Sequence, residues 1–177
     1  MSMAASPQFS KRFKGAAVVM GVASCGKTSV GEMLAEKLSA HFIEGDRLHP
    51  ASNVAKMSAG NPLTDDDRWP WLAAVGASLA GNEAAVASCS ALKRSYREAI
   101  AKAAQRPVAF IFLHGTRELL EQRIHDRKGH FMPPSLLDSQ LKTLEPPQAD
   151  ELALKLDIAE PVEALVQKAQ AWLLNQT

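Results

Sequence analysis

Short apolar runs alternate along this chain with longer segments in which apolar residues recur at helical spacing. The runs predict strands at residues 16–20, 41–44, 84–89, 108–113 and 152–158. The periodic segments predict helices at residues 27–40, 53–60, 93–105, 116–127, 135–144 and 161–175, and a further helix opening at Thr64. Because the run at 108–113 is unbroken, it is typical of a parallel strand covered on both faces. The pattern therefore predicts an α/β fold.

Composition limits the number of domains and the classes of partner. A length of 177 residues with 46% hydrophobic residues fits one core, which we place at residues 15–177 after a flexible leader of residues 1–14. The net charge of +1 gives no electrostatic reason to expect nucleic-acid or membrane binding. Two cysteines, no membrane-length apolar run and no secretory signal favour a cytoplasmic protein.

The chemistry centres on the segment GVASCGKT between the first predicted strand and the first predicted helix. It matches G-x-x-x-x-G-K-S/T, whose backbone N–H groups wrap around phosphate oxygens. Lys27 would add a mobile charge at the β- and γ-phosphates, and the Thr28 hydroxyl can ligate Mg²⁺. The segment predicts binding of a nucleoside triphosphate with magnesium by Gly21, Val22, Ala23, Ser24, Cys25, Gly26, Lys27 and Thr28. The Cys25 side chain is interpreted as a small filler.

Polar residues follow the second predicted strand, where ligands gather in open parallel sheets. Glu44, Asp46, Arg47 and His49 are therefore expected to line the same crevice as the phosphate loop; the alternative is a solvated loop with Asp46 as a turn former. The third predicted strand does not end in the acidic residue common in phosphate-loop ATPases. Metal ligation is then expected from Thr28, water and either Glu44 or Asp46.

Basic residues recur near the starts of two predicted helices. Arg68 follows a capping sequence at Thr64 and three aspartates, and it either clamps a substrate carboxylate or pairs with those aspartates. Lys93 and Arg97 lie near the start of the helix at 93–105, where cations oppose the helix dipole. That arrangement is easier to understand if an anionic ligand compensates.

A second basic group precedes a Gly- and Pro-containing stretch. Arg123 and Arg127 lie one turn apart on a helix that leads into His130 and two prolines. We interpret residues 126–136 as a small lid that supplies positive charge in phosphoryl transfer; an exposed basic helix is the alternative. Together these features indicate a small kinase that acts on a compact acceptor.

The sequence closely resembles the gluconokinases, which belong to the shikimate-kinase-like group within the nucleoside-monophosphate-kinase fold. The resemblance runs from about Ala16 to the C-terminus. It rests on Glu44-Gly45-Asp46 with Leu48-His49-Pro50, Asn53-Val54-Ala55-Lys56-Met57, Gly60 to Arg68 with Pro70-Trp71-Leu72, Cys89 to Lys93 with Tyr96-Arg97, Arg123 with Arg127, Gly129-His130-Phe131, and Ser139-Gln140 with Leu144-Glu145-Pro146. The chain departs from the usual family pattern at Ala23 and Cys25, where Gly and Ser are more common, and at Glu44, where Asp is frequent.

The resemblance implies a fold, an activity and an assembly. The fold is a three-layer phosphate-loop kinase fold with a five-stranded parallel sheet in the order 2-3-1-4-5. The activity is transfer of the ATP γ-phosphoryl group, with Mg²⁺, to the 6-hydroxyl of D-gluconate. The product, 6-phospho-D-gluconate, would feed the pentose phosphate or Entner-Doudoroff route. The resemblance also implies a homodimer.

The same resemblance implies roles for single residues. The residues expected to be catalytic are Lys27, Asp46, Lys93 and Arg127, with Asp46 orienting the acceptor hydroxyl and Lys93 near the transferring phosphate. The residues expected to bind the substrate are Asp46, His49, Arg68, Arg97, His130 and Gln140. Arg123 would lie against the adenine, Arg127 would reach the phosphates, and the turn at 157–161 would border the base.

Two other functions are compatible with parts of this pattern. A kinase of the same fold that acts on another small hydroxy acid, such as shikimate, would use Arg68 and Asp46 in the same way. A nucleotide-dependent switch would need only the phosphate loop, but the chain has no N-K-x-D guanine-reading segment. The long matches at residues 66–72 and 89–93 favour gluconate.

Overall fold

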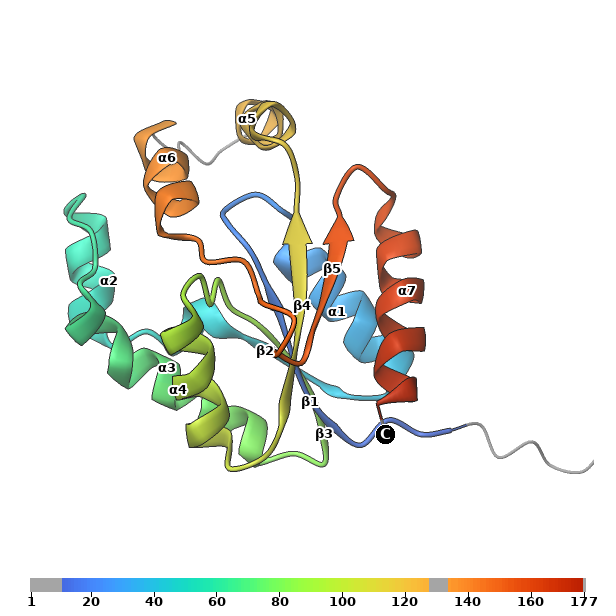
Figure 1. Ribbon diagram of the computed structural model, residues 1–177. Helices are drawn as coiled ribbons and strands as arrows, with labels where there is room; N and C mark the ends of the chain where they lie inside the picture. The colour runs from blue at the N-terminus through green and yellow to red at the C-terminus, as the bar shows by residue number, and fades with distance from the viewer. Residues whose placement is uncertain (1–10, 128–133, 177) are drawn as a thin grey trace, which may run out of the picture.

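The computed structural model describes residues 11–127 and 134–176 of the 177-residue chain. Its centre is a parallel sheet in the order β2-β3-β1-β4-β5, which confirms the predicted topology (Figure 1). The strands are β1 (Gly15–Met20), β2 (His41–Glu44), β3 (Ala84–Ser88), β4 (Val108–His114) and β5 (Ala153–Asp157). Because β1 lies in the middle, the loop that leaves its carboxyl end lies centrally at that edge of the sheet.

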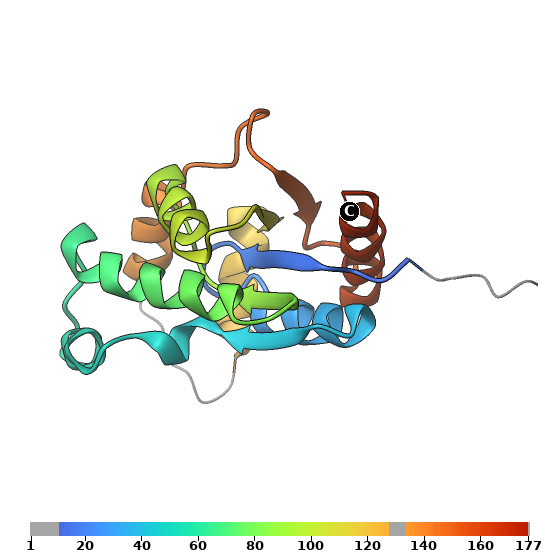
Figure 2. The same cartoon turned by 90° about the horizontal axis from the view of Figure 1, so that it is seen from below.

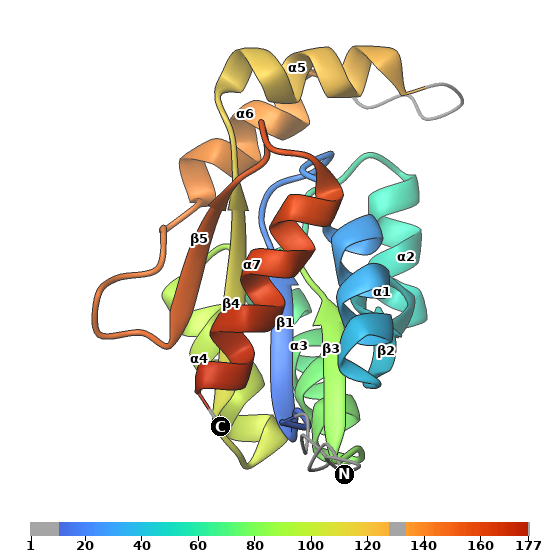
Figure 3. The same cartoon turned by 90° about the vertical axis from the view of Figure 1, so that its right-hand side faces the viewer.

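Helices cover both faces of the sheet and its carboxyl edge. The helices are α1 (Lys27–Leu38), α2 (Ala51–Ser58), α3 (Asp65–Ala80), α4 (Arg94–Ala104), α5 (Arg117–Asp126), α6 (Pro134–Thr143) and α7 (Val162–Asn175). Helices α1 and α7 pack together on one face, and α3 and α4 pack together on the other (Figures 2 and 3). Helices α5 and α6 lie beyond the carboxyl ends of the strands (Figure 1).

The two faces of the sheet bury separate sets of side chains. One core packs α1 and α7 against residues such as Val19 and Ile111, and the other packs α3 and α4 against residues such as Val18 and Phe110. Neighbouring residues of β1 thus contribute to opposite cores, as strand geometry requires. Helices α3 and α4 approach closely because Gly76 has no side chain; a Cβ atom there would lie 2.4 Å from the Ile100 carbonyl oxygen.

Apart from shifts of one or two residues at the ends of elements, two details differ from the sequence-based expectations. Phe13, which we placed in the leader, is only 4% exposed and belongs to the core beneath α1, so the packed domain begins before Gly15. The segment Gly45–Leu48, expected as a loop, forms a short 3-10 helix (η1). Residues 1–10 of the leader and 128–133 of the lid lie outside the described residues.

Candidate active site

The phosphate loop joins the buried end of β1 to the start of α1. Its backbone enters the left-handed region at Ser24, with φ of 64°, and at Gly26, with φ of 95°. A Cβ atom at Gly21 would lie 2.7 Å from the Leu113 carbonyl oxygen, which explains glycine at that position. Gly26 is the N-cap of α1 and makes no side-chain cap, and the first turn of α1 contains no acidic residue. The first N–H groups of the helix are therefore available to an anion.

Polar groups of this loop fit a polyphosphate. The Lys27 ammonium group donates hydrogen bonds to the carbonyl oxygens of Gly21 at 3.0 Å and Val22 at 2.9 Å, so the charge lies over the loop. The buried Ser24 hydroxyl has no hydrogen-bond partner among the described residues. The Ala23 N–H donates to Oε1 of Gln140 at 2.7 Å. An unpaired buried hydroxyl is costly, and a phosphate oxygen would satisfy it.

Thr28, the predicted metal ligand, lies beside Glu44. The Thr28 hydroxyl donates to one oxygen of the Glu44 carboxylate at 2.9 Å, and the Ser88 hydroxyl donates to the other at 2.6 Å. Glu44 from β2 thus places a carboxylate next to Ser88, the last residue of β3. Within the described residues, no group of three or more His, Cys, Asp or Glu side chains is arranged to hold a metal ion. The Thr28 hydroxyl and the Glu44 carboxylate are the oxygen groups here that suit a Mg²⁺ ion bound to ATP.

Asp46 lies on η1, which packs tightly against the end of β3. A Cβ atom on Gly45 would lie only 2.0 Å from the Ser88 carbonyl oxygen, and Nε1 of Trp71 donates to the Gly45 carbonyl at 2.8 Å. Burial raises the pKa of the Cys89 thiol to about 12, and both Asp46 and Lys27 act on that thiol electrostatically. Asp46 and Lys27 thus lie at the same carboxyl end of the sheet, on the segments that follow β2 and β1.

His49 is fixed in one orientation beside Asp46. Its ring stacks on Trp71 with the centroids 4.0 Å apart, and Nδ2 of Asn53 lies 3.2 Å from its Nδ1. Because the amide group of Asn53 is the donor, Nδ1 accepts and the proton lies on Nε2. Burial lowers the pKa of His49, and the Arg68 charge lowers it further while Asp46 opposes the change. We therefore expect a neutral imidazole at neutral pH.

A second charged cluster joins the starts of α3 and α4. The Lys93 ammonium group lies 3.3 Å from both Asp65 oxygens, and the Tyr96 hydroxyl donates to Oδ1 of Asp65 at 2.5 Å. Nη1 of Arg68 donates to the Tyr96 hydroxyl at 3.1 Å. The hydrogen bond from Tyr96 and the contacts with Lys93 lower the pKa of Asp65. Nη1 of Arg68 also lies 3.8 Å from Oδ1 of Asp65, so Arg68 does pair with the aspartate run. Its Nε and Nη2 have no hydrogen-bond partner among the described residues.

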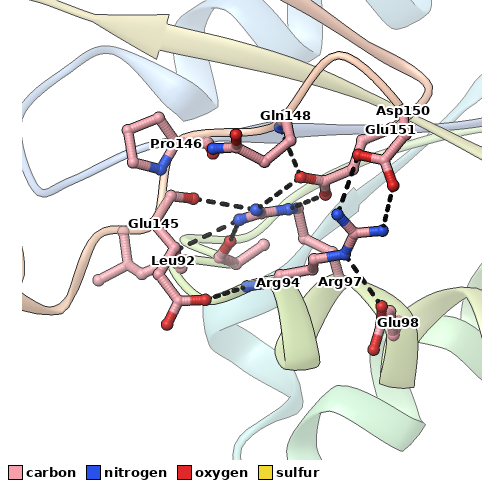
Figure 4. A network of polar contacts seen from close by, with 10 residues as sticks. Leu92, Arg94, Arg97, Glu98, Glu145, Pro146, Gln148, Asp150 and Glu151 are labelled. Carbon is pink, nitrogen blue, oxygen red and sulfur yellow. Dashed lines mark hydrogen bonds and ion pairs between the residues drawn. The ribbon is translucent and has the colours of Figure 1, made fainter.

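The structure corrects the role expected of Arg97. All its guanidinium nitrogens are used within the chain: Nε and Nη2 bond to Glu151, Nη1 to the Ala91 and Leu92 carbonyl oxygens, and Nη2 also to the Glu145 carbonyl oxygen (Figure 4). Arg97 is also only 2% exposed. It therefore has no donor left for a substrate. The anion that compensates this cation is a carboxylate of the protein and not a ligand.

The residues predicted on the lid and on the helices beside it are placed only in part. Arg123 of α5 donates from Nη2 to the Ile158 carbonyl oxygen at 2.7 Å, so it lies at the turn expected to border the adenine. Its charge also acts on Cys25 in the phosphate loop, a thiol whose pKa burial raises. Arg127 is exposed at the end of α5. His130 lies outside the described residues, whereas Gln140 contacts the phosphate loop as described above.

Comparison with known proteins identifies the family. A family model described as an AAA domain matches residues 17–147. A gluconokinase of Gluconobacter oxydans is 49% identical over 143 residues, which cover 78% of this chain and 80% of the relative. A thermoresistant gluconokinase of Escherichia coli is 42% identical, covering 84% and 87%. A crystal structure of a gluconokinase from Sinorhizobium meliloti superimposes with a TM-score of 0.86 at 54% identity, covering 93% of this chain and 94% of that one. The chain belongs to the gluconokinase family.

Several residues of this gluconokinase-family site were not assigned a role from the sequence. Asp65 enters the sequence analysis only as one of three aspartates after Thr64, but it pairs with Lys93 and Tyr96. Asn53, which is buried, orients His49 through its amide group. In the sequence, only a polar residue within a predicted helix pointed to such a role. Glu151 lies in a polar stretch without periodicity, so the sequence gave no indication of its role.

None of the described helices has the length and apolar content needed to cross a membrane.

Proposed function

We propose that this chain transfers the γ-phosphoryl group of ATP to the 6-hydroxyl of D-gluconate and releases 6-phospho-D-gluconate. The observation that carries the proposal is the phosphate loop, with Lys27 and the unpaired Ser24 hydroxyl, at the same carboxyl end of the sheet as the η1 segment with Asp46 and the adjoining His49. Membership in the gluconokinase family supports gluconate as the acceptor over shikimate. The two halves of the site would bring donor and acceptor together at one edge of the sheet.

The nucleotide half would act mainly through charge and position. The amides of the phosphate loop and Lys27 would hold the β- and γ-phosphates, and Arg123 and Arg127 would meet the adenine and the phosphates. Mg²⁺, when bound with ATP, would neutralise charge on the phosphate oxygens near Thr28 and Glu44. Because the transition state of phosphoryl transfer is loose, such stabilisation supplies most of the acceleration.

The acceptor half would orient one hydroxyl and bind one carboxylate. Asp46 would accept a hydrogen bond from the acceptor hydroxyl and take its proton as transfer proceeds. Arg68 has free guanidinium donors for the gluconate carboxylate, and neutral His49 offers an Nε2 donor to a polyol hydroxyl. Lys93 would meet the transferring phosphoryl group, and Gln140 of α6 and His130 of the lid would complete the pocket.

Assembly and location form part of the same proposal. We expect a homodimer, which size-exclusion chromatography with light scattering tests directly. We also expect a cytoplasmic protein. Both cysteines are free and buried, which is compatible with a reducing compartment.

The decisive experiment is identification of the product. The protein is incubated with MgATP and, separately, gluconate, shikimate, pantoate, glycerate or a nucleoside monophosphate, and new phosphoesters are located by phosphorus NMR. We expect ADP release that depends on gluconate and a phosphomonoester on carbon 6. Preferential phosphorylation of shikimate would refute the acceptor assignment. Slow ATP hydrolysis that no acceptor stimulates would instead indicate a nucleotide switch.

A further inference from the structure

The turn that carries Lys93 is held in a strained conformation. Ala91 is fully buried and has φ of 44°, in the left-handed region that residues with a Cβ atom seldom adopt. Such a conformation persists only where its surroundings fix it. Nη1 of Arg97 donates to the Ala91 carbonyl oxygen at 2.9 Å and to the Leu92 carbonyl oxygen at 3.3 Å. The backbone N–H of Glu145 donates to the same Leu92 oxygen at 2.8 Å.

Arg97 links this turn to the segment that follows α6. Its Nε bonds to Oε1 of Glu151 at 2.7 Å, and its Nη2 bonds to Oε2 of Glu151 at 3.2 Å and to the Glu145 carbonyl oxygen at 2.9 Å (Figure 4). The Glu145 side chain accepts from the backbone N–H of Arg94 at 3.1 Å, at the start of α4. Hydrogen bonds thus connect the segment from Glu145 to Glu151 with both neighbours of Lys93, namely Leu92 and Arg94.

The Arg97–Glu151 pair is buried, unlike its neighbour. The side chains of Arg97 and Glu151 are 2% and 10% exposed. Arg94, one turn earlier on α4, makes a bidentate pair with Asp150, the residue before Glu151, but those side chains are 40% and 64% exposed. The Arg94 guanidinium bonds to carboxylates of Glu98 and Asp150, whereas that of Arg97 also bonds to carbonyl oxygens of the turn. One helix therefore carries two ion pairs to the same segment, and only one of them fixes the turn.

We propose that Arg97 and Glu151 are positioning residues for phosphoryl transfer: they hold the Ala91–Lys93 turn in its strained shape and so place the Lys93 ammonium group. The proposal rests on the proposed function in one respect, namely that Lys93 meets the transferring phosphoryl group. The pair acts through Lys93 and touches no substrate itself. The same segment follows α6, whose Gln140 contacts the phosphate loop, so the pair also joins the Lys93 turn to α6.

The test compares Glu151→Gln with the matched exposed variant Asp150→Asn. Each replaces a carboxylate by an amide of similar shape in the same segment. For Glu151→Gln we expect kcat to fall by about 10-fold to 100-fold, because small displacements of a positioned group are costly in catalysis. The dissociation constant of MgATP should change less than about twofold, because the hydrogen bonds of the Glu151 side chain go to Arg97 and Gln148 and none of them reaches the phosphate loop. Asp150→Asn should keep kcat within about twofold, as surface ion pairs contribute little.

A double-mutant cycle with Lys93→Met tests whether the effect passes through Lys93. In the Lys93→Met background, Glu151→Gln should cause no further loss of kcat. An equal loss in both backgrounds would overturn the proposal, and so would a Glu151→Gln variant no slower than Asp150→Asn. Should Glu151→Gln fail to fold, Arg97→Lys keeps the charge but loses the fork geometry and should give the same dependence on Lys93.

Hydrogen exchange provides a readout that does not depend on activity. Peptides that contain residues 91–93 should exchange faster in Glu151→Gln than in Asp150→Asn or in the unmodified protein. Unchanged exchange in this turn would overturn the proposal even if activity fell. If the turn loosens while the unmodified protein fails to phosphorylate gluconate, the proposed function fails and the structural clamp stands.

Discussion

The two cationic regions of the site are built in different ways. In the phosphate loop, Lys27 contacts carbonyl oxygens five and six positions before it, so its charge is held within one short segment. In the region around Lys93, the contacts join residues 28 positions apart, at Asp65, and 54 positions apart, between Arg97 and Glu151. The Lys27 contacts depend on local backbone geometry, whereas the Lys93 and Arg97 contacts form only when distant parts of the chain pack together. We therefore expect them to respond differently to substitution.

The largest effect is expected from Lys27→Ala in the local region. Loss of this charge should lower kcat for gluconate phosphorylation by about 10³-fold or more, because it removes a preorganised charge from the transferring phosphates. The slow hydrolysis of ATP without acceptor should fall as well, since the loop serves both reactions. Steady-state kinetics with and without gluconate measure both. Near-normal turnover in a folded Lys27→Ala protein would contradict the assignment of the loop.

A smaller and more selective effect is expected from Asp46→Asn. Because the transition state is loose, general-base catalysis contributes little to the rate. We therefore expect kcat to fall by about 10²-fold, at the lower end of the range for general-base catalysis. The dissociation constant of MgATP and the hydrolysis without acceptor should stay close to those of the unmodified protein. Isothermal titration with nucleotide and a coupled ADP assay measure these quantities. A loss of nucleotide affinity equal to that of Lys27→Ala would remove the distinction between the two halves of the site.

The fold was predictable because its signals are local. Unbroken apolar runs such as 108–113 identify β4, and Thr64 with Asp67 forms the capping box that the sequence indicates at the start of α3. The phosphate loop was predictable for the same reason, since its motif lies within eight consecutive residues. The sheet order came from the family resemblance and agrees with the structure.

The region around Arg97 was not predictable, because its partners are distant in sequence. A cation at the start of α4 opposes the helix dipole, and an anionic ligand was a reasonable explanation. The structure supplies the negative charge from Glu151 and from Asp65 instead. Glu151 follows a proline-containing stretch in which no spacing rule indicates a partner. The position of that stretch relative to α4 is set only by tertiary packing.

A third prediction tests whether close packing places Asp46. The substitution Gly45→Ala puts a methyl group 2.0 Å from a backbone oxygen of β3, so the η1 segment must shift. We expect a loss of about 1–3 kcal/mol in the free energy of unfolding, as overpacking usually costs, together with a raised KM for gluconate. Gly81→Ala is the matched control, because its nearest contact would be 3.8 Å away. Chemical denaturation and kinetics of both variants measure the difference; equal stability would show that the contact at Gly45 is not restrictive.

The smallest effect concerns pH and His49. Burial lowers the pKa of His49 below its ordinary value of 6.5, so the unfolded chain binds a proton at a higher pH than the folded one. The neutral ring therefore contributes stability that is fully present above pH 6.5 and is lost as pH falls through the lower folded value. His114 has a pKa lowered in the same direction, so His49→Gln is needed to separate the two. We expect the stability difference between the unmodified protein and His49→Gln to shrink between pH 7 and pH 5, measured as the shift in Tm. A difference that is constant across this range would show that His49 is not held neutral on Trp71. The proposed role of His49 as a neutral hydrogen-bond donor in the acceptor half of the site would then be wrong.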